Sequence, residues 1–234
     1  MNARLRATEG VAWTASPPEH NLLNPDHLTS RAEALARPAP VPAQPGVYAW
    51  YFDVPPSGVP HDGTHRNAFG YLLYLGIAPR EPRRSDGQPS SQNLRKRIRT
   101  HFRGDASRST LRLTLGLLLS EELGIQLRRN GSGRLTFGEG EAAVSDWMAE
   151  HSRVCWYVHR QPWRVESELI SELVLPLNLD QNRHGSFHET LSGGLGLGAD
   201  VEEGLRDHGL RGRLVLADLV ERRSQLGARL RAQQ

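Results

Sequence analysis

Cysteine is almost absent from this chain of 234 residues, which contains only Cys155. A single thiol cannot form an intramolecular disulfide, so a disulfide-stapled scaffold is excluded. Zinc sites built from cysteine clusters, and iron–sulfur clusters held by this chain alone, are excluded for the same reason. Any metal that the protein holds must therefore be bound through oxygen or nitrogen. Cys155 itself lies in an apolar stretch and is expected to be an unreactive core residue.

Long apolar stretches are also missing. The mean hydropathy is -0.52, and no run approaches the roughly 18 apolar residues that would suggest a membrane span. The first ten residues, MNARLRATEG, lack the apolar segment of a secretory signal peptide. We therefore expect a cytoplasmic protein that has no membrane partner.

Lysine is represented by Lys96 alone, so nearly all of the 29 basic residues are arginine. The formal net charge is only +3, with a sequence pI of about 9.4. A GC-rich genome would produce this bias without any function, whereas planar, bidentate contacts to phosphate would select for it. Between Arg80 and Arg112, however, ten basic residues stand against three acidic ones. Such a local excess is typical of a surface that binds a polyanion.

Hydrophobic periodicity and helix-end signals predict a mixed set of elements. A short helix capped by Asn24, with Pro25 in its first turn, is expected to end near Arg37, and the stretch PAPVPAQP after it is typical of a linker. The remaining predicted elements, in chain order, are strands at 46–53 and 71–77, a helix that begins at Asn93, a helix at 109–123, a hairpin at 125–138, a helix at 141–151, a strand at 154–159, a helix at 163–177 and a helical tail at 201–231.

This order of elements indicates an α+β fold and not a regular alternation of strand and helix. Two strands in succession predict an antiparallel hairpin with a long connection. We expect three parts: a Pro/Ala-rich extension and linker at residues 1–44, a main domain at 45–183 and a helical extension at 184–234.

The apolar stripe of the helix at 163–177 contains a carboxylate. The stripe consists of Val165, Leu169, Ile170, Leu173 and Leu177. Glu166 lies three and four residues before two of these and so points inward, whereas Glu168 and Glu172 lie on the outer face. An unpaired buried charge costs on the order of several kcal/mol, so an inward glutamate needs a cation or hydrogen-bond donors. The alternative is an acid favoured by the helix dipole, or a border residue that reaches water.

An arginine and two tyrosines are candidate partners for that carboxylate. Arg97 lies three residues after Leu94 and four before His101, at the border of the helix face that packs on the sheet. It is the natural counterpart of the inward carboxylate or of a bound phosphate. Tyr48 and Tyr74 can share one face of the sheet if the hairpin pairs in register, although each tyrosine alone is more typical of core packing.

Taken together, these residues resemble the GIY-YIG nuclease family. Gly46-Val47-Tyr48 matches the first signature, and Tyr74-Leu75-Gly76 matches the second. The residues that match the arginine helix are Leu94, Arg97 and His101, and those that match the acidic helix and its asparagine are Glu166, Leu169, Ile170, Pro176 and Asn178. Each tripeptide alone is a weak signal, but the ordered set across residues 46–178 is specific and covers somewhat more than half of the chain.

The resemblance implies a small antiparallel three-stranded sheet flanked by helices, and hydrolysis of DNA phosphodiester bonds with one Mg²⁺ or Mn²⁺ ion. Glu166 would be the only protein ligand of the metal, and Arg97 would stabilise charge on the scissile phosphate. Tyr48 would act as general base or position the attacking water. Supporting roles would fall to Tyr74 and His101, for the water and the phosphate, and to Asn178, which would brace the site.

Further basic residues are predicted to contact the nucleic acid. They are Arg95, Lys96, Arg99 and Arg103 on the arginine helix, and Arg128, Arg129 and Arg134 at the predicted hairpin. Two strands joined by a glycine-bearing turn form a ribbon narrow enough for a DNA groove. The alternative is a solvated hairpin whose arginines reflect the genome.

The chain departs from the family pattern in two respects. Ile77 follows Gly76 where the family usually has a small polar or basic residue, and there are insertions at 79–92 and 104–151. A catalytically inactive nucleic-acid-binding module on the same fold therefore remains an alternative to an endonuclease that acts on duplex or branched DNA. A third alternative is an interaction protein whose Pro-rich start and helical tail dock a partner.

Overall fold

A computed structural model describes residues 21–82 and 90–178. Three strands form one antiparallel sheet in the order β2-β1-β5. Its central strand is β1 (Gly46–Phe52), and β2 (Tyr71–Ala78) and β5 (Ser152–Val158) lie at its edges. The predicted α+β class, the hairpin of the first two strands and the three-stranded sheet are therefore confirmed, whereas the helical extension predicted for residues 184–234 lies outside the described residues.

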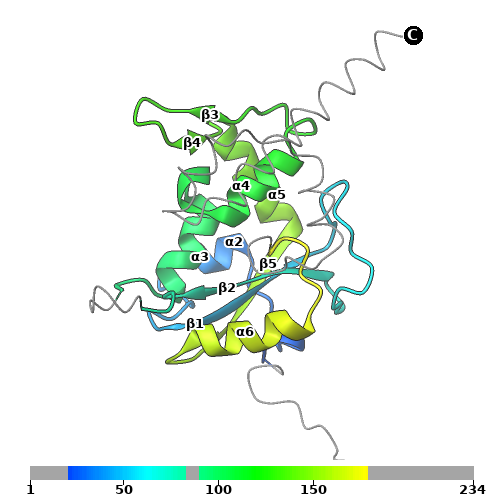
Figure 1. The fold of residues 1–234 in the computed structure, drawn as a ribbon, viewed down its shortest axis with the longest axis vertical. Helices are drawn as coiled ribbons and strands as arrows, with labels where there is room; N and C mark the ends of the chain where they lie inside the picture. The colour runs from blue at the N-terminus through cyan, green and yellow to red at the C-terminus, as the bar shows by residue number, and fades with distance from the viewer. Residues whose placement is uncertain (1–20, 83–89, 179–234) are drawn as a thin grey trace, which may run out of the picture.

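Helices cover both faces of the sheet (Figure 1). The helix α6 (Pro162–Glu172) lies on one face, and α2 (Arg31–Leu35), α3 (Leu94–Arg103) and α5 (Gly140–His151) lie on the other. Farther from the sheet are η1 (Ala106–Arg108), α4 (Thr110–Leu118) and a small hairpin of β3 (Arg128–Arg129) and β4 (Leu135–Thr136). Within the described residues, no helix is long and apolar enough to cross a bilayer.

The central strand β1 is buried along its whole length because both of its faces are covered. Its side chains alternate between the two sides, as in any strand. Tyr48, Trp50 and Phe52 join the core beneath α3 and α5, whereas Val47 and Tyr51 join the core beneath α6. The register of β1 therefore fixes which helices the first candidate tyrosine faces.

The short N-terminal helix begins later than predicted. The helix α2 starts after Ser30, whose side chain accepts from the Glu33 N–H, while the Glu33 carboxylate accepts from the Ser30 N–H at 2.7 Å. Just before this capping box, two main-chain hydrogen bonds of 2.9 and 3.0 Å join Thr29 to Val154 of β5. A helix cannot run through a residue that pairs in this way, so the predicted start at Asn24 is wrong.

The PAPVPAQP stretch packs on the domain, contrary to the linker predicted there. Val41 is fully buried, and its carbonyl accepts a 2.7 Å hydrogen bond from Arg95 Nε. Leu22 is fully buried too and lies in the same core cluster as Cys155, which is itself buried, as predicted. The described part of the N-terminal extension therefore shares the core of the main domain.

The helix α6 ends earlier than predicted, at Glu172 and not near Leu177. Pro176 disfavours the α conformation at the residue before it, and the cap residue Leu173 is already extended. The chain turns back toward the sheet, where the Leu177 N–H donates to the Leu73 carbonyl of β2 at 3.1 Å. This early end carries the following residues to β2.

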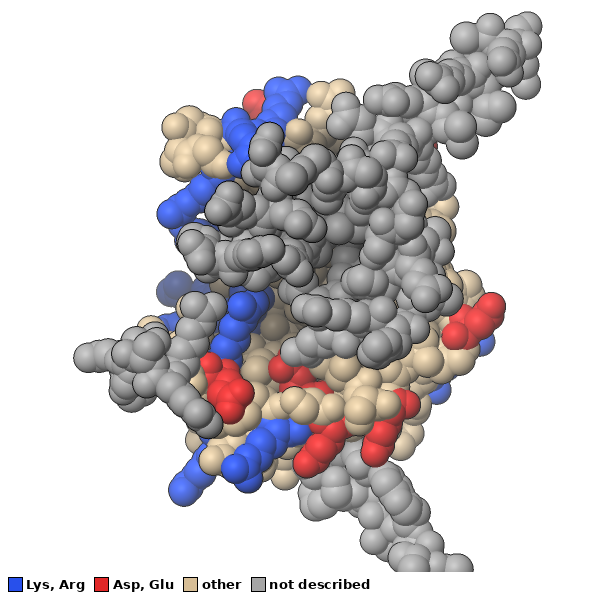
Figure 2. Space-filling view, viewed as in Figure 1, with Lys and Arg blue, Asp and Glu red and all other residues tan. Residues whose placement is uncertain are grey.

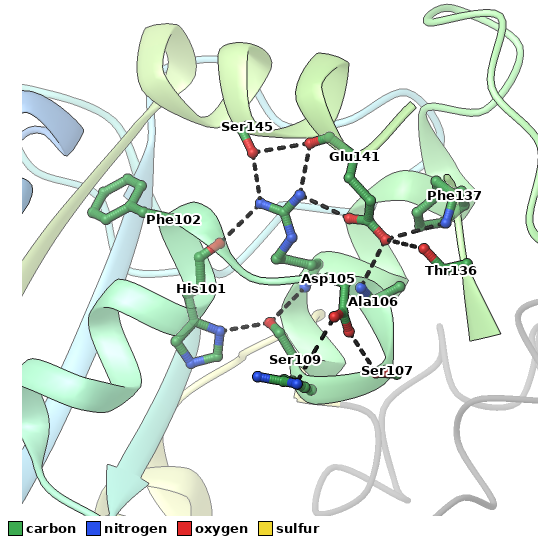
Figure 3. A network of polar contacts seen from close by, with 12 residues as sticks. His101, Phe102, Asp105, Ala106, Ser107, Ser109, Thr136, Phe137, Glu141 and Ser145 are labelled. Carbon is green, nitrogen blue, oxygen red and sulfur yellow. Dashed lines mark hydrogen bonds and ion pairs between the residues drawn. The ribbon is translucent and has the colours of Figure 1, made fainter. Parts of the chain in front are cut away.

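A fully buried arginine holds the inserted region together (Figure 3). Arg112 of α4 donates to the His101 carbonyl at 3.1 Å, to Ser145 Oγ at 3.0 Å, and to the carboxylate and carbonyl of Glu141 at 2.8 and 2.7 Å. The second carboxylate oxygen of Glu141 accepts from the Ala106 N–H, the Thr136 hydroxyl and the Phe137 N–H. This network joins η1, α4, α5 and β4 to the end of α3, and Arg112 cannot contribute to the predicted polyanion-binding surface.

We predict that Glu141→Ala lowers the free energy of unfolding by about 3–5 kcal/mol, because it leaves the Arg112 guanidinium charged and buried without its carboxylate. The double variant Arg112→Met/Glu141→Leu should lose less than the single variant, since no buried charge remains. Asp146→Ala, an exposed change on the same helix, should stay within about 0.5 kcal/mol of wild type. Urea denaturation measures all three, and a Glu141→Ala loss below about 1 kcal/mol would contradict the role of the network.

Candidate active site

Residues of β1, β2, α3 and α6 line a cavity of about 390 Å³. Five of the six residues predicted to be catalytic are among them: Tyr48, Tyr74, Arg97, Glu166 and Asn178. These residues are up to 130 positions apart in the chain. The fold therefore brings together the side chains that the sequence singled out, with the sixth, His101, lying behind this cavity wall.

Tyr48 extends from β1 toward α3, and its side chain is 1% exposed. Gly76 is its register partner on β2, and a Cβ atom at Gly76 would lie 2.5 Å from Tyr48 Oη. Only glycine leaves room for the phenol at that position. The Tyr48 oxygen lies 2.9 Å from His101 Nε2 and accepts a 3.3 Å hydrogen bond from Arg97 Nε.

Tyr74 lies on the same face of the sheet, as predicted, with its ring centroid 6.5 Å from that of Tyr48. Burial raises the pKa of both phenols above its usual value, and the positive charge of Arg97 opposes this shift. Both side chains are therefore neutral phenols at pH 7 and present hydroxyl groups, not phenolates, to the site.

Arg97 is fixed by hydrogen bonds at both ends of its guanidinium. Besides the bond from Nε to Tyr48, its NH1 group donates to the Arg108 carbonyl at 2.9 Å. The side chain lines the cavity, and a guanidinium keeps its charge at any physiological pH. Arg97 thus places a fixed positive charge in the cavity wall, on the side of α3 that the sequence predicted.

Glu166 and Asn178 line the same cavity from α6 and from the chain after it. Glu166 is 8% exposed, whereas Glu168 and Glu172 on the same helix face outward, as predicted. The Asn178 side chain accepts from the Leu75 N–H and donates to the Leu75 carbonyl, both at 2.8 Å. Asn178 therefore ties the chain after α6 to the middle of β2.

His101 is fully buried and does not line the cavity. Its Nε2 faces Tyr48, and its Nδ1 lies 2.7 Å from Ser109 Oγ. Burial, together with the positive charges of Arg97 and Arg112, holds the pKa of His101 well below its usual value, so the imidazole is neutral at pH 7. The resemblance implied that His101 supports the water and the phosphate, and the structure places it behind Tyr48, in contact with the phenol and not in the cavity lining.

The residues predicted to contact nucleic acid differ in exposure. Lys96 and Arg103 of α3 are exposed, Arg99 is half-buried, and Arg95 directs its Nε to the Val41 carbonyl. The three hairpin residues are all exposed: Arg128, Arg129 and Arg134. Figure 2 shows Lys and Arg side chains along the side of the molecule that carries the hairpin and α3, with Asp and Glu side chains gathered toward α6.

Several residues near the site did not stand out as site residues in the sequence. Arg80, Thr110 and Trp163 line the cavity, and Ser109 contacts His101. Arg80 belongs to the basic stretch that was counted, but nothing marked it for the cavity. The other three carry no local signal, because their neighbours in space come from distant parts of the chain. Ile77, the departure from the family pattern, also lines the cavity.

The carboxylate of Glu166 suits a hard divalent cation. Among the residues that the structure describes, no group of three or more His, Cys, Asp and Glu side chains could hold a metal together. Mg²⁺ is commonly bound by one or two carboxylates together with waters and substrate phosphate oxygens. The Glu166 carboxylate lines a cavity that also contains Arg97 and the exposed Glu81, and this arrangement fits such a site and does not fit a closed structural zinc site.

No curated protein and no solved structure matches the chain. A family model described as the GIY-YIG catalytic domain matches residues 46–193, more than half of the chain. The matched region starts at the first glycine of β1 and includes every residue of the cavity wall discussed above. The chain therefore belongs to the GIY-YIG family of nuclease catalytic domains.

Proposed function

We propose that this protein is a divalent-metal-dependent endonuclease that hydrolyses phosphodiester bonds of DNA. The observation that carries the proposal is the meeting of the Glu166 carboxylate, the Arg97 guanidinium and the Tyr48 phenol in the wall of one cavity. Phosphodiester hydrolysis needs a carboxylate that binds a metal ion, a positively charged side chain that binds the phosphate, and a hydroxyl that orients a water.

Glu166 would hold the metal through its carboxylate, at the side of the cavity formed by α6. When bound, Mg²⁺ or Mn²⁺ supplies Lewis-acid polarisation of the phosphate and stabilises negative charge on the leaving oxygen. Asn178 keeps this wall in place through its two hydrogen bonds to Leu75 of β2. Both residues act from the same short segment, 166–178, so the turn after α6 sets their separation.

Arg97 would bind the scissile phosphate and stabilise the negative charge that develops on its oxygens. Its hydrogen bonds to Tyr48 and to the Arg108 carbonyl fix the guanidinium before substrate arrives. Such preorganisation is effective because the charge needs no rearrangement during the reaction.

Tyr48 would orient the attacking water through its phenol oxygen. As a phenolate, formed when its own proton passes to solvent in the cavity, it would accept one proton of that water as the new P–O bond forms. The ester P–O bond breaks at the same time, and the departing oxygen takes up a proton from solvent. Burial favours the neutral phenol, and the Arg97 charge partly offsets this effect, so Arg97 both binds phosphate and makes the phenolate form of Tyr48 easier to reach. Tyr74, whose ring lies 6.1 Å from that of His101, closes the cavity on the β2 side and supports the same water.

We predict that Glu166→Ala abolishes metal-dependent nicking of supercoiled plasmid while DNA binding and folding are retained, because the variant lacks the carboxylate that holds the cation. Glu168→Ala, an exposed change on the same helix, should keep wild-type activity. EDTA should stop the wild type in the same assay. Wild-type nicking by Glu166→Ala would refute the metal site, and DNA binding without nicking by the wild type would support the inactive-module alternative.

Arg97→Ala should lower turnover at saturating DNA by roughly 100- to 1000-fold, the usual loss when one preorganised group that faces developing charge is removed. Arg103→Ala, on the exposed part of the same helix, should weaken binding instead and lower the slope of log K against log salt by up to about one unit. Single-turnover kinetics separates the two effects. A larger loss of turnover for Arg103→Ala than for Arg97→Ala would reverse the assignment.

The exposed arginines of the β3–β4 hairpin should contribute to DNA binding. Replacement of Arg128, Arg129 and Arg134 by Ala should reduce duplex affinity or change the cleavage pattern, with little change in the thermal midpoint, because these side chains bury no core. Filter binding and cleavage mapping on linear and branched DNA provide the measurement. Unchanged affinity and unchanged cleavage would assign the hairpin a purely structural role.

A further inference from the structure

Three consecutive residues where α4 begins meet the active site, although they belong to the insertion at 104–151. The Arg108 carbonyl accepts from Arg97, Ser109 Oγ contacts His101, and Thr110 lines the cavity. The insertion is thus in contact with the catalytic wall and is not confined to the periphery. Ser109 is the one that acts on the buried histidine.

The hydrogen bonds of Ser109 determine the direction of its proton. Ser109 is fully buried, and in the described part of the chain its Oγ has two partners, the Arg112 N–H at 3.1 Å and His101 Nδ1 at 2.7 Å. The Arg112 N–H is a donor and cannot accept. The Ser109 proton therefore has one acceptor within these residues, the Nδ1 lone pair, and a serine that donated nothing would leave a buried hydroxyl unsatisfied.

We propose that Ser109 is a positioning residue of the active site, whose hydroxyl donates to His101 Nδ1 and so fixes the tautomer in which His101 Nε2–H donates to Tyr48 Oη. A neutral imidazole with an accepting Nδ1 must carry its proton on Nε2. The 2.9 Å contact between Nε2 and Tyr48 is then a hydrogen bond given to the phenol, not one taken from it.

The consequence for Tyr48 is that its oxygen receives two hydrogen bonds, from His101 Nε2 and from Arg97 Nε. Its own proton is excluded from those two directions and is left to point into the cavity. If Tyr48 loses that proton, the same two donors already hydrogen-bond its negatively charged oxygen. In the opposite tautomer, Tyr48 would donate to His101 and its proton would be turned away from the substrate. This consequence rests on the proposed nuclease function, whereas the tautomer itself does not.

The tautomer is measured directly by nitrogen-15 NMR of the imidazole in the full-length protein at pH 7. The wild type should show a single neutral His101 with Nε2 protonated, its signals assigned through the His101→Gln variant. Ser109→Ala should lose this single tautomer, and Ser109→Thr, which keeps a hydroxyl, should restore it. A wild-type His101 protonated on Nδ1 would overturn the proposal, whether or not any variant folds.

The kinetic consequence is measured on supercoiled plasmid with Mg²⁺. Ser109→Ala should lower kcat by roughly 10- to 100-fold, the range usual for the loss of an outer-shell partner, while KM for DNA stays within about twofold. Because Ser109 also caps α4, the matched control is Asn93→Ala, which removes the cap of α3 without touching the His101 ring. That control should lose stability comparably and keep kcat.

The outcomes separate this proposal from the proposed function. A wild type without Mg²⁺-dependent nicking would overturn the nuclease function, and the NMR result would still decide the tautomer. A wild type that cleaves, together with a Ser109→Ala variant that keeps both the Nε2–H tautomer and the wild-type kcat, would overturn the positioning role alone.

Discussion

A phenol buried in the middle of a sheet must have its oxygen satisfied, and this requirement organises the site. Tyr48 lies on the central strand and is almost inaccessible to solvent, so its hydroxyl must find protein partners. The partners come from α3, where His101 and Arg97 lie four residues apart and reach the same oxygen. Gly76 completes the arrangement from β2, because any side chain there would occupy the place of the phenol.

Two separate devices tie the inserted region to this arrangement. Arg112 of the insertion donates a hydrogen bond to the His101 carbonyl, and Ser109 of the insertion contacts the His101 imidazole. The end of α3 is thus held at its main chain by Arg112, which is ion-paired with Glu141, and at its His101 side chain by Ser109, the N-cap residue of α4. An insertion that is anchored to α3 through both its main chain and the His101 side chain belongs to the rigid frame of the candidate site.

The parts of the site that depend on local pattern could be predicted from the sequence. The helical period placed Arg97 at the border of its helix and Glu166 on the inner face, and strand alternation placed Tyr48 and Tyr74 on one face. The helical period also predicted that His101 lies on the buried face of its helix. It could not predict which residue packs against His101 there, so the position of His101 behind Tyr48 could not be predicted.

The remaining differences come from contacts between distant segments. Arg112 resembled a surface charge in a basic stretch because its partner Glu141 lies 29 residues later. Ser109 was predicted only as the first residue of a helix, because the histidine that it faces is brought close by the turn at η1. The helix starts after Ser30 and not at Asn24, because Thr29, directly before Ser30, pairs with Val154 of β5. Each error follows from tertiary pairing that no single segment encodes.

The hydrogen bonds at the margins of the sheet have a consequence for self-association. An edge strand with free amides and carbonyls invites another chain to add a strand. Along β2, the Leu73 carbonyl is taken by Leu177 and both main-chain groups of Leu75 are taken by the Asn178 amide. Along β5, both groups of Val154 are taken by Thr29. Strand addition at these positions would first have to break bonds within the domain, so the segment after α6 and the segment before α2 both protect the sheet against edge-to-edge aggregation.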